Sequence, residues 1–581
     1  MVSSPLPDLV LRCRPRPDFR AMWKNIAIAL LSCLLAVAVA LLAFVVSRLG
    51  SSERRHSEAA AAAADRDEAK PELDAPEPPA PEPPHPVVAA LEEVFAVIEG
   101  NEDFEGAAIG FCLVGPDGEI LFERNGRAAQ IPASVLKTVT TATALELLGP
   151  DFTFETRLGT SEPGEAEPGA AAKPPADLVL LGGGDPTLSP ADLASWAQRL
   201  AEAGVQSVPG RVVGDGRHFE GSPFPDFWDW GDIGNGYGSP VSGLNLGHNR
   251  FTAVFSPGEK VGEAAVLMGT FPEVPGVAWW NETTTAAEDS GDGVVIYGGE
   301  RAAVMHLRGT VPLGGELEVV GAIPDPERFA AHHLRAALVA AGIQVEGESF
   351  GAGELFLAGE PVPAISDEIL LHRSAPLLEI VASIHETSDN HETECLFRTL
   401  GLRTRIAPDE AVREHWRRRG LELADLRMVD GSGLARANHI SPETLARLQR
   451  LAAEGPAGEA YVESLLVLEE VGIRFKAGAM SSVRTYTGLV EDGPGRLAFA
   501  LMANHYPKIA AVRELQGAVF QALRLWGEDG EDEEAAEDEG PEKDSAAEEK
   551  EEPQDSDPDE SEADAEEGDG AEDAPEDGLP R

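Results

Sequence analysis

A serine and a lysine stand three residues apart in the segment IPASVLKTVTTATALELLG, which runs from Ile131 to Gly149. Positions i and i+3 are neighbours on one face of a helix, so the Lys137 amine is expected beside the Ser134 hydroxyl. A serine becomes a nucleophile when a base removes its proton, and lysine serves as that base when burial or a nearby cation lowers its pKa. The pair predicts nucleophilic catalysis, and a polar turn of an ordinary helix is the alternative.

Lysine is rare in this chain, which makes the position of each one informative. The sequence has 9 Lys against 37 Arg, and only five of the lysines fall between Val87 and Trp526. Surface positive charge is therefore supplied mainly by arginine, which stays protonated and cannot act as a base. A lysine three residues after a serine is more informative here than in an average protein.

Two further segments carry residues of matching chemistry. The segment ETSDNHETECLFRTLG contains the only S-x-N of the chain, Ser388 to Asn390, just before an amphipathic helical run. The segment RFKAGAMSSVRTYTGLV places Lys476 on an expected strand. The three residues that follow it are Ala477, Gly478 and Ala479.

The elements that would position these residues can be read from the surrounding pattern. Pro132 lies just before the expected helix, and Gly149 with Pro150 ends it. The N-terminus of that helix adds free N–H groups and a positive dipole near the serine. Apolar residues recur at helical spacing at Val135, Val139, Ala142, Leu145 and Leu148.

Alternating apolar runs predict antiparallel strands at both ends of the region from Val87 to Trp526. The first hairpin is expected at Ala107 to Val114 and Glu119 to Arg124, with the turn GPDG between them. The second is expected at Gly472 to Met480, Val483 to Val490 and Arg496 to Ala503. More than three hundred residues rich in Gly, Pro and short strand-like runs separate the two.

Two glycine-containing motifs resemble functional patterns but lack their context. LGGGDP, from Leu181 to Pro186, lacks the Lys and Ser/Thr that follow the glycines of a phosphate-binding loop, so a tight turn is predicted. GESFG fits the hydrolase G-x-S-x-G pattern, which requires a helix straight after the serine. Because ELFLAG, after Gly353, is strand-like, Ser349 is not predicted to be a nucleophile.

A helix-start S-x-x-K, a loop S-x-N and a strand K-x-G, in that order, resemble the three elements of penicillin-binding proteins and serine β-lactamases. The chain is most similar to the low-molecular-mass class C branch, the D-alanyl-D-alanine carboxypeptidase/endopeptidases of peptidase family S13. Besides SDN, three more segments carry this resemblance between Val87 and Trp526: LLGGGDPTL, WDWGDIGNGYGSPVSGLNLGHN and DGSGLARANHISPETLARL. The long gap between Lys137 and Ser388 also resembles the corresponding gap in that family.

The resemblance implies catalytic roles for three residues. Ser134 would be acylated by the penultimate D-alanine carbonyl of a peptidoglycan stem peptide, and Lys137 would take its proton. Ser388 would relay a proton to the leaving group. Water would then release the acyl group, with no metal or cofactor, and β-lactam antibiotics are expected to bind in the same way as the peptide.

The resemblance also implies a substrate-binding strand and loop. Asn390 would bind the substrate amide, and Lys476 would supply positive potential for the proton shuttle and for a substrate carboxylate. The backbone N–H groups of Ser134 and Ala479 would form the oxyanion hole. The substrate-binding residues would be Asn390, Lys476, Ala477, Gly478 and Ala479.

Two departures from the family pattern concern the recognition of a terminal carboxylate. The family usually has K-T-G followed by Thr or Ser, whereas Ala477 and Ala479 lack both hydroxyls. The lysine that commonly precedes S-x-N is also absent, because Glu386 and Thr387 stand there. The oxyanion hole uses backbone groups and does not depend on these side chains.

Two functions from different classes fit these residues. The first is an active serine peptidase on D-Ala-D-Ala or on cross-linked peptides, which the intact serines, lysines and asparagine favour. The second is a degenerate family member that binds peptidoglycan with little turnover, which Ala477 and Ala479 favour. The long gap between Lys137 and Ser388 disfavours a β-lactamase.

Composition sets limits on the partners and on the number of domains. At 581 residues, with 43% apolar residues, the chain is expected to form more than one domain. Its formal charge of −55 argues against nucleic acid as a partner, because phosphate binding needs a basic surface. From Gly527 to Arg581 there are 28 acidic residues against 3 basic ones, so this tail is predicted to be disordered. It would act as a solvating segment, or capture cations or a basic partner.

The N-terminal region predicts membrane attachment. Ile26 to Val46 is an uncharged apolar run whose length as a helix, roughly 32 Å, matches a hydrocarbon core of about 30 Å. More basic residues precede this run than follow it, which predicts a cytoplasmic N-terminus. A cleaved signal peptide, including a lipoprotein box at Cys33, is the alternative, but the run is too long for it. We expect a single-pass protein of the bacterial inner membrane with its catalytic part in the periplasm.

The expected fold class is α/β: a β-lactamase/transpeptidase-like domain, with an antiparallel sheet and helices, interrupted by inserted mostly-β domains. The expected order is a cytoplasmic N-terminus (1–25), a transmembrane signal anchor (26–46), an Ala/Pro/Glu-rich linker (47–86), the first part of the transpeptidase-like domain (87–156), inserted domains (157–363), its second part (364–526) and an acidic disordered tail (527–581).

Cysteines and histidines give no metal signature. Four cysteines in so long a chain form no disulfide framework, and Cys112 and Cys395 are expected to be core residues. His385 and His391 flank the S-x-N segment, but their spacing fits no common zinc pattern. They are interpreted as solvated loop residues.

Overall fold

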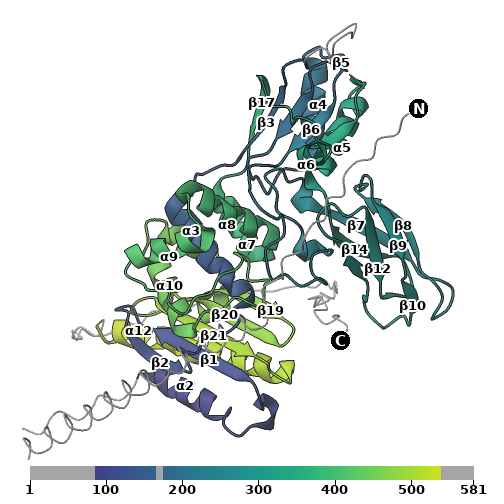
Figure 1. Ribbon diagram of the computed structural model, residues 1–581. Coiled ribbons are helices and arrows are strands. Elements are labelled where there is room, and N and C mark those ends of the chain that lie inside the picture. Colours follow the sequence, from purple (N-terminus) through teal and green to yellow (C-terminus); the bar gives the residue numbers. More distant parts are fainter. Residues whose placement is uncertain (1–84, 165–174, 538–581) are drawn as a thin grey trace, which may run out of the picture. The chain divides into compact units, whose positions relative to one another are not determined.

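The computed structural model describes residues 85–164 and 175–537 (Figure 1). The predicted anchor 26–46 and the linker up to residue 84 lie outside the described residues, as does the acidic tail after Glu537. Within the described ranges, no helix combines the length and apolar character that crossing a membrane requires.

A six-stranded sheet, in the order β18-β19-β20-β21-β1-β2, carries the catalytic part. Its neighbouring strands are antiparallel, and both predicted hairpins are present, as β1 with β2 and as β19, β20 and β21. Strand β1 at the start of the described chain pairs along its whole length with β21 near the end. The strands are β1 (Ala108–Val114), β2 (Ile120–Arg124), β18 (Leu466–Leu468), β19 (Ile473–Met480), β20 (Val483–Val490) and β21 (Leu497–Asn504).

Helices cover both faces of this sheet, which explains why its central strands are apolar on both sides. In β1, Phe111 and Leu113 face one hydrophobic core, while Cys112 and Val114 face the other. The first core contains α2 (Pro86–Ala96) and α12 (Ile509–Glu537). The second contains α3 (Leu136–Leu148), α7 (Leu377–Thr387), α8 (Asn390–Thr404), α9 (Pro408–Arg418), α10 (Pro442–Ala453) and α11 (Gly458–Glu463) (Figure 1).

The insertion leaves and rejoins the catalytic part through two adjacent segments. The Phe154 N–H donates to Ser374 Oγ at 3.0 Å, and the Ser374 N–H donates to the Phe154 carbonyl at 3.1 Å. The first half of the insertion is a five-stranded sheet in the order β16-β6-β4-β3-β17. Helix α5 packs on β6 and β16. These elements are β3 (Glu155–Thr160), β4 (Leu178–Leu181), β6 (Val212–Asp215), β16 (Ser349–Gly351), β17 (Asp367–Arg373), α4 (Pro190–Glu202), α5 (Pro326–Ala340) and α6 (Ala352–Leu357).

The second half of the insertion is made of strands. Its sheets have the orders β14-β7-β8, β11-β12-β9 and β10-β13, and a further pair joins β15 with β5 of the first half. The strands are β5 (Ser207–Val208), β7 (Arg250–Ser256), β8 (Val266–Phe271), β9 (Ala278–Asn281), β10 (Thr284–Ala286), β11 (Val295–Tyr297), β12 (Val304–Arg308), β13 (Thr310–Pro312), β14 (Leu317–Ala322) and β15 (Gln344–Val345).

The insertion differs from the prediction in three respects. It is mixed α/β rather than mostly β in its first half, because α4 and α5 cover the five-stranded sheet. Strand β17, predicted to lie in the second catalytic segment that starts at residue 364, pairs with β3 and extends the insertion to Arg373. The strand-like run after Gly353 is part of helix α6, whose buried residues Ala352 and Leu355 are three positions apart. Ser349 nevertheless lies on β16, in the insertion and outside the group around Ser134.

Most of the tail that is predicted to be disordered, Gly527 to Arg581, lies outside the described residues. Helix α12 continues to Glu537, into the acidic segment. Val519 and Leu523 anchor this helix in the core, so the unfavourable nucleation step is already complete where the acidic segment begins. Alanine and glutamate are strong helix formers and extend it.

Candidate active site

Ser134 lies at a sharp turn between two elements. It is the middle residue of a single 3-10 turn, Ala133–Val135, which leads directly into α3. Ala133, just before it, has φ 48°, in the left-handed region that is unfavourable for residues with a Cβ. Thr485 of β20 donates to the Pro132 carbonyl at 2.6 Å, which ties this turn to the sheet. The half-buried serine is thereby held at the front of the helix.

Lys137 is fully buried one turn into this helix. Its Nζ lies 2.9 Å from Ser134 Oγ, 2.6 Å from Asn390 Oδ1 and 2.8 Å from the Ser432 carbonyl oxygen. A neutral amine has two N–H donors and one lone pair. In this neutral form the two carbonyl-type oxygens use the donors, which leaves the lone pair for the Ser134 hydroxyl.

The surroundings of Lys137 favour this neutral form. Burial, and then the nearby Lys476 ammonium, lower the pKa of Lys137 to about 7, against the attraction of Asp430 and other carboxylates. Burial also lowers the pKa of Lys476, to about 8. The site thus combines a base that is half neutral near pH 7 with a second lysine that is still mostly protonated.

Lys476 lies on β19, and its Nζ is 3.1 Å from the Ala477 carbonyl oxygen. The strand runs directly against the serine turn: a Cβ added at Gly478 would lie 2.8 Å from the Ser134 nitrogen. Only glycine allows this approach. Strand β18 pairs with residues up to Phe475, so in the described part of the chain the outer edge of β19 beyond Phe475 carries no partner strand.

The first two residues of the S-x-N segment, Ser388 and Asp389, link helix α7 to helix α8. Ser388 ends α7 in a left-handed conformation, with φ 59°, and Asn390 begins α8. Asn390 Oδ1 contacts Lys137, while its Nδ2 donates to the Tyr237 carbonyl at 2.9 Å. Its amide group is thereby oriented from both sides. Ser388 and Asn390 line a cavity of about 750 Å³ together with Tyr237.

The loop DGSG, residues 430–433, supplies the third partner of Lys137 and was not predicted to contribute to the site. Buried Asp430 accepts hydrogen bonds from the Gly433 and Ala435 N–H groups. It also accepts from Asn438 Nδ2 and from Trp228 Nε1 of the insertion. These bonds hold the Ser432 carbonyl against Lys137. An aspartate followed by the residues Gly-Ser-Gly was the available signal in the sequence.

A second buried carboxyl group supports the same loop. Glu394 on α8 accepts from the N–H groups of Gly431 and Ser432, at 2.8 and 2.7 Å. Burial, and then the nearby Asp430, raise the pKa of Glu394 to about 8, and burial also raises that of Asp430. Because Asp430 accepts from four donors, the negative charge is best placed on Asp430 and the proton on Glu394.

His385 and His391 are buried, so the interpretation as solvated loop residues is wrong. His385 Nε2 lies 2.9 Å from Thr141 Oγ1, and its Nδ1 lies 3.0 Å from Ser464 Oγ. His391 Nε2 lies 3.1 Å from Asn245 Oδ1. Both residues lie on helices, on the faces turned to the core, and burial lowers the pKa of each. Among the residues that the structure describes, no group of His, Cys, Asp and Glu side chains is suited to a metal ion.

Ion pairs connect the insertion to the S-x-N segment. Asp389, between Ser388 and Asn390, pairs with Arg250 of β7 at 2.8 Å, which holds the pKa of this carboxyl at about 2 despite its burial. One turn later on α8, Glu392 lies 3.1 Å from His248 Nε2. The insertion therefore contributes to the position of the site loop.

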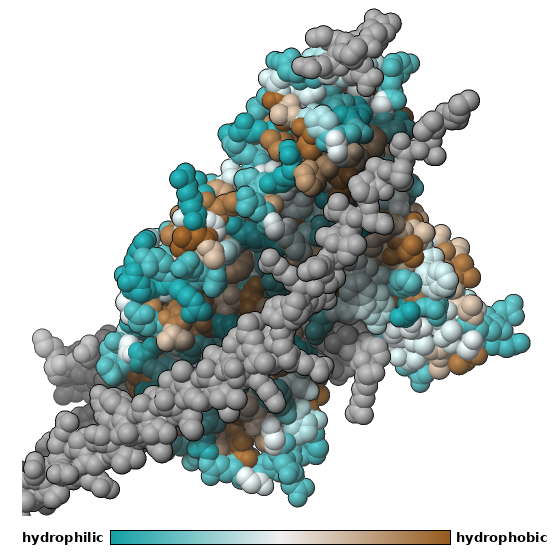
Figure 2. Space-filling view, viewed as in Figure 1, coloured by the Kyte–Doolittle hydropathy of each residue, from teal (hydrophilic) through white to brown (hydrophobic). Residues whose placement is uncertain are grey.

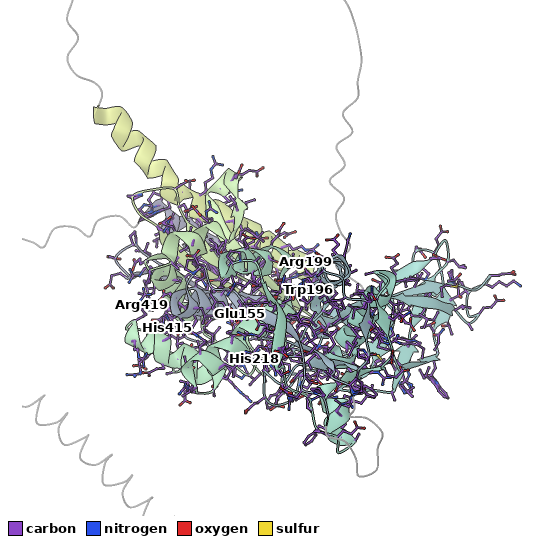
Figure 3. The ribbon with its side chains drawn as sticks, turned by 90° about the horizontal axis from the view of Figure 1, so that it is seen from above. Glu155, Trp196, Arg199, His218, His415 and Arg419 are labelled. Atoms are coloured by element: carbon purple, nitrogen blue, oxygen red, sulfur yellow. The ribbon has the colours of Figure 1, made fainter. Side chains whose placement is uncertain are left out.

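Other ionisable clusters lie away from Ser134. A cavity of about 780 Å³ is lined by Glu155 and His218, both labelled in Figure 3, and contains none of the predicted site residues. His415 and Arg419, also labelled there, both bind the buried Glu146 of α3. Cys112 and Cys395 are buried and free, as predicted.

The structure thus brings the predicted site residues together from three distant segments. Hydrogen bonds join Ser134, Lys137 and Asn390, and β19, which carries Lys476, places Gly478 against the serine turn. Four contributors were not assigned a role from the sequence: Trp228, Tyr237, Asp430 and Ser432.

Comparison with known proteins identifies what this arrangement is similar to. The model of the D-Ala-D-Ala carboxypeptidase 3 (S13) family matches residues 90–523. A D-alanyl-D-alanine carboxypeptidase of Actinomadura sp. (strain R39) is 30% identical over 449 residues, covering 71% of this chain and 80% of that protein. The D-alanyl-D-alanine carboxypeptidase DacB of Haemophilus influenzae is 25% identical over 353 residues, covering 59% and 70%. The crystal structure of penicillin-binding protein 4 from Haemophilus influenzae covers 74% of this chain and 96% of its own, with a TM-score of 0.59 and 20% identity, and shares the fold.

Proposed function

Because this chain belongs to the D-Ala-D-Ala carboxypeptidase 3 (S13) family, we infer that it is a penicillin-binding serine peptidase that cleaves peptidoglycan stem peptides through an acyl-enzyme on Ser134. One observation carries the assignment of the nucleophile. The buried Lys137 amine, with its pKa lowered to about 7, lies 2.9 Å from the Ser134 hydroxyl and has its two other neighbours oriented as acceptors.

Acylation follows from this geometry. Ser134 Oγ attacks the carbonyl carbon of the penultimate D-alanine while its proton passes to Lys137 Nζ. The carbonyl oxygen becomes an oxyanion, which the backbone N–H groups of Ser134 and Ala479 stabilise. The close approach of β19 at Gly478 supports this pairing of N–H groups.

Collapse of the tetrahedral intermediate breaks the peptide bond. The departing amine needs a proton, which Lys137 returns by way of Ser388, a residue that lines the cavity. Protonated Lys476 stabilises the charges during this transfer. Water then attacks the ester and releases the acyl group, with Lys137 again accepting a proton. A β-lactam acylates Ser134 by the same first step.

A substrate peptide would bind as an added strand. In the described residues, the outer edge of β19 beyond Phe475 is unpaired and offers backbone donors and acceptors next to the nucleophile, and Asn390 contacts the base Lys137. The non-catalytic alternative is not favoured, because the base, the nucleophile and the amide group of Asn390 are all in contact.

The direct test uses the purified full-length chain. Incubation with a penicillin should add the mass of one penicilloyl group, and prior labelling should block release of D-alanine from a stem peptide. A chain that forms no adduct and releases no D-alanine would instead be a binding protein.

The missing hydroxyls at Ala477 and Ala479 predict weak carboxypeptidase activity. Hydrogen bonds to a charged group contribute roughly 1.5–3 kcal/mol, so loss of one lowers efficiency towards a free terminal carboxylate by about tenfold or more. Cross-linked peptides lack that carboxylate in the same form. The double change Ala477→Thr with Ala479→Thr should therefore raise D-alanine release more than cleavage of a cross-linked dimer, as measured by chromatography.

Valine is the matched control at both positions, since it has the shape of threonine without the hydroxyl. The Val/Val variant should show no gain. If the native chain already releases D-alanine efficiently and threonine changes nothing, the carboxylate is bound elsewhere. Arg484, which the register places directly opposite Ala479, is then the next candidate.

We also propose that the chain is anchored in the inner membrane through residues 26–46, with its catalytic part in the periplasm. The uncharged run and the excess of basic residues before it support this orientation. Protease added to spheroplasts should degrade the region after residue 47 and leave a small membrane-bound fragment. Full protection of the C-terminal part would reverse the orientation.

A further inference from the structure

An aromatic row crosses the outer face of the sheet β11-β12-β9. Tyr297 is paired with His306, and His306 with Trp280, so the three side chains project from the same face of neighbouring strands. The alternate positions Met305 and Leu307 are buried on the inner face. The row spans two strand spacings, about 10 Å.

The row is accessible and has polar groups beside it. Trp280 is 58% exposed, and the centre of its ring lies 6.2 Å from that of His306. The Arg308 guanidinium lies 5.7 Å from the centre of the Tyr297 ring, and its Nε donates to Glu282 at 2.8 Å. Figure 2 shows apolar residues, in brown, among hydrophilic ones on the visible surface of the β8, β9 and β12 region.

The row begins at the cavity beside the S-x-N segment. Tyr297 lines the same cavity of about 750 Å³ as Ser388 and Asn390. Tyr237, whose carbonyl accepts from Asn390 Nδ2, also lines it. From this end the row continues over His306 to Trp280, so a substrate bound beside Ser388 and Asn390 can continue onto it.

We propose that the row of Tyr297, His306 and Trp280 binds the glycan strand from which the stem peptide projects. This proposal rests on the proposed function, because it assigns a second binding surface to the same substrate. The chemistry of the occupant fits. One face of a pyranose ring carries only C–H groups and stacks on an aromatic ring, while its equatorial hydroxyl and acetamido groups hydrogen-bond to flanking polar side chains.

The polar groups beside the row match these needs. Glu282 accepts hydrogen bonds, and Arg308 donates them. Their mutual ion pair fixes both side chains before a ligand arrives, which reduces the entropy lost on binding. The length of the row suits two successive sugar rings, the repeating unit of the glycan. A substrate bound at both places would be polymeric peptidoglycan rather than a free peptide.

The test uses the full-length chain carrying Ser134→Ala, so that no turnover occurs, and peptide-free glycan strands as the probe. Adding Trp280→Ala should raise the dissociation constant for these strands at least about fivefold. Trp280→Phe should stay within about twofold of the parent, because it retains a ring for stacking. Phe356→Ala is the matched control, since Phe356 is 75% exposed on α6, outside the row, and should change nothing.

A second measurement separates glycan binding from catalysis. With Ser134 restored, Trp280→Ala should raise KM for intact peptidoglycan at least about fivefold, and should leave kcat and the cleavage of a glycan-free stem peptide unchanged. The proposal is wrong if the parent does not bind peptide-free strands, if it binds only strands that carry peptides, or if Trp280→Ala and Phe356→Ala have the same effect. Failure of the proposed function would appear differently, as absence of a penicilloyl adduct with glycan binding intact.

Discussion

Replacing Lys137 by arginine is expected to slow the acylation of Ser134 by a penicillin about a thousandfold. General-base catalysis contributes roughly 10²–10⁴-fold, and arginine keeps the positive charge but cannot accept the serine proton. The larger guanidinium also has to fit a fully buried position between Ser134, Asn390 and Ser432. The measurement is the time course of the penicilloyl adduct by intact mass.

Two further variants serve as controls for this experiment. Ser134→Ala should form no adduct at all, because the nucleophile is gone. Lys508→Arg is the matched control: Lys508 is an exposed lysine that pairs with Asp103, so its replacement should leave the rate unchanged. Acylation of Lys137→Arg at the native rate would show that another group removes the serine proton.

The pH dependence of the same rate tests the electrostatics of the site. Lys137 must be neutral to act as base, so the rate should rise with pH through its lowered pKa of about 7. Lys476 must stay protonated, so the rate should fall above its pKa of about 8. A narrow bell is expected, with apparent values that belong to the pair of lysines. An acylation rate that keeps rising to pH 10 would mean that burial does not lower the pKa of Lys137.

Replacing Asp430 by alanine is expected to lower the free energy of unfolding by about 4 kcal/mol or more, since it leaves four buried donors without their acceptor at roughly 1–3 kcal/mol each. Asp430→Asn should also be destabilising, because its NH₂ group would face N–H donors. Both changes should slow acylation, as the Ser432 carbonyl would no longer hold Lys137. Urea unfolding and the adduct time course measure the two effects.

Glu394→Gln is the matched control for Asp430. With its pKa raised to about 8, Glu394 is protonated at neutral pH, and glutamine keeps the carbonyl oxygen that accepts from Gly431 and Ser432. Glu394→Gln should lower the free energy of unfolding at pH 7 by less than about 1 kcal/mol. A carboxyl whose pKa is raised on folding loses stability as pH rises from its unfolded to its folded pKa. The free energy of unfolding of Glu394→Gln should therefore rise relative to that of the native chain between pH 5 and 8. If Asp430→Asn and Glu394→Gln lower the free energy of unfolding equally, this assignment of charge is wrong.

Local pattern was enough to predict the elements that carry the chemistry. The helix after Ser134 and the strands β1, β2, β19, β20 and β21 were found because apolar periodicity and turn residues are local properties. The run after Gly353 was misassigned as a strand for the converse reason. A six-residue helix such as α6 is too short for periodicity to distinguish it from a strand.

Domain boundaries depended on long-range pairing. Strand β17 lies after the predicted end of the insertion at residue 363 and was assigned to the catalytic part, but it pairs with β3, about two hundred residues earlier. Pairing partners at such separation are chosen by burial of both faces of a sheet, and no local pattern records that choice.

The sequence by itself determined which residue types could perform acyl transfer and that Ser134 and Lys137 share a helix face, because i and i+3 spacing is a property of the helix alone. Tertiary structure decided whether that pair is chemically competent. A lysine has its ordinary pKa in water, and only the enclosure of Lys137 by α8, the DGSG loop and β19 removes water and brings Lys476 near enough to lower it. The same enclosure buried His385 and His391 and placed Asp430 behind the base, since burial is set by which distant segments pack together.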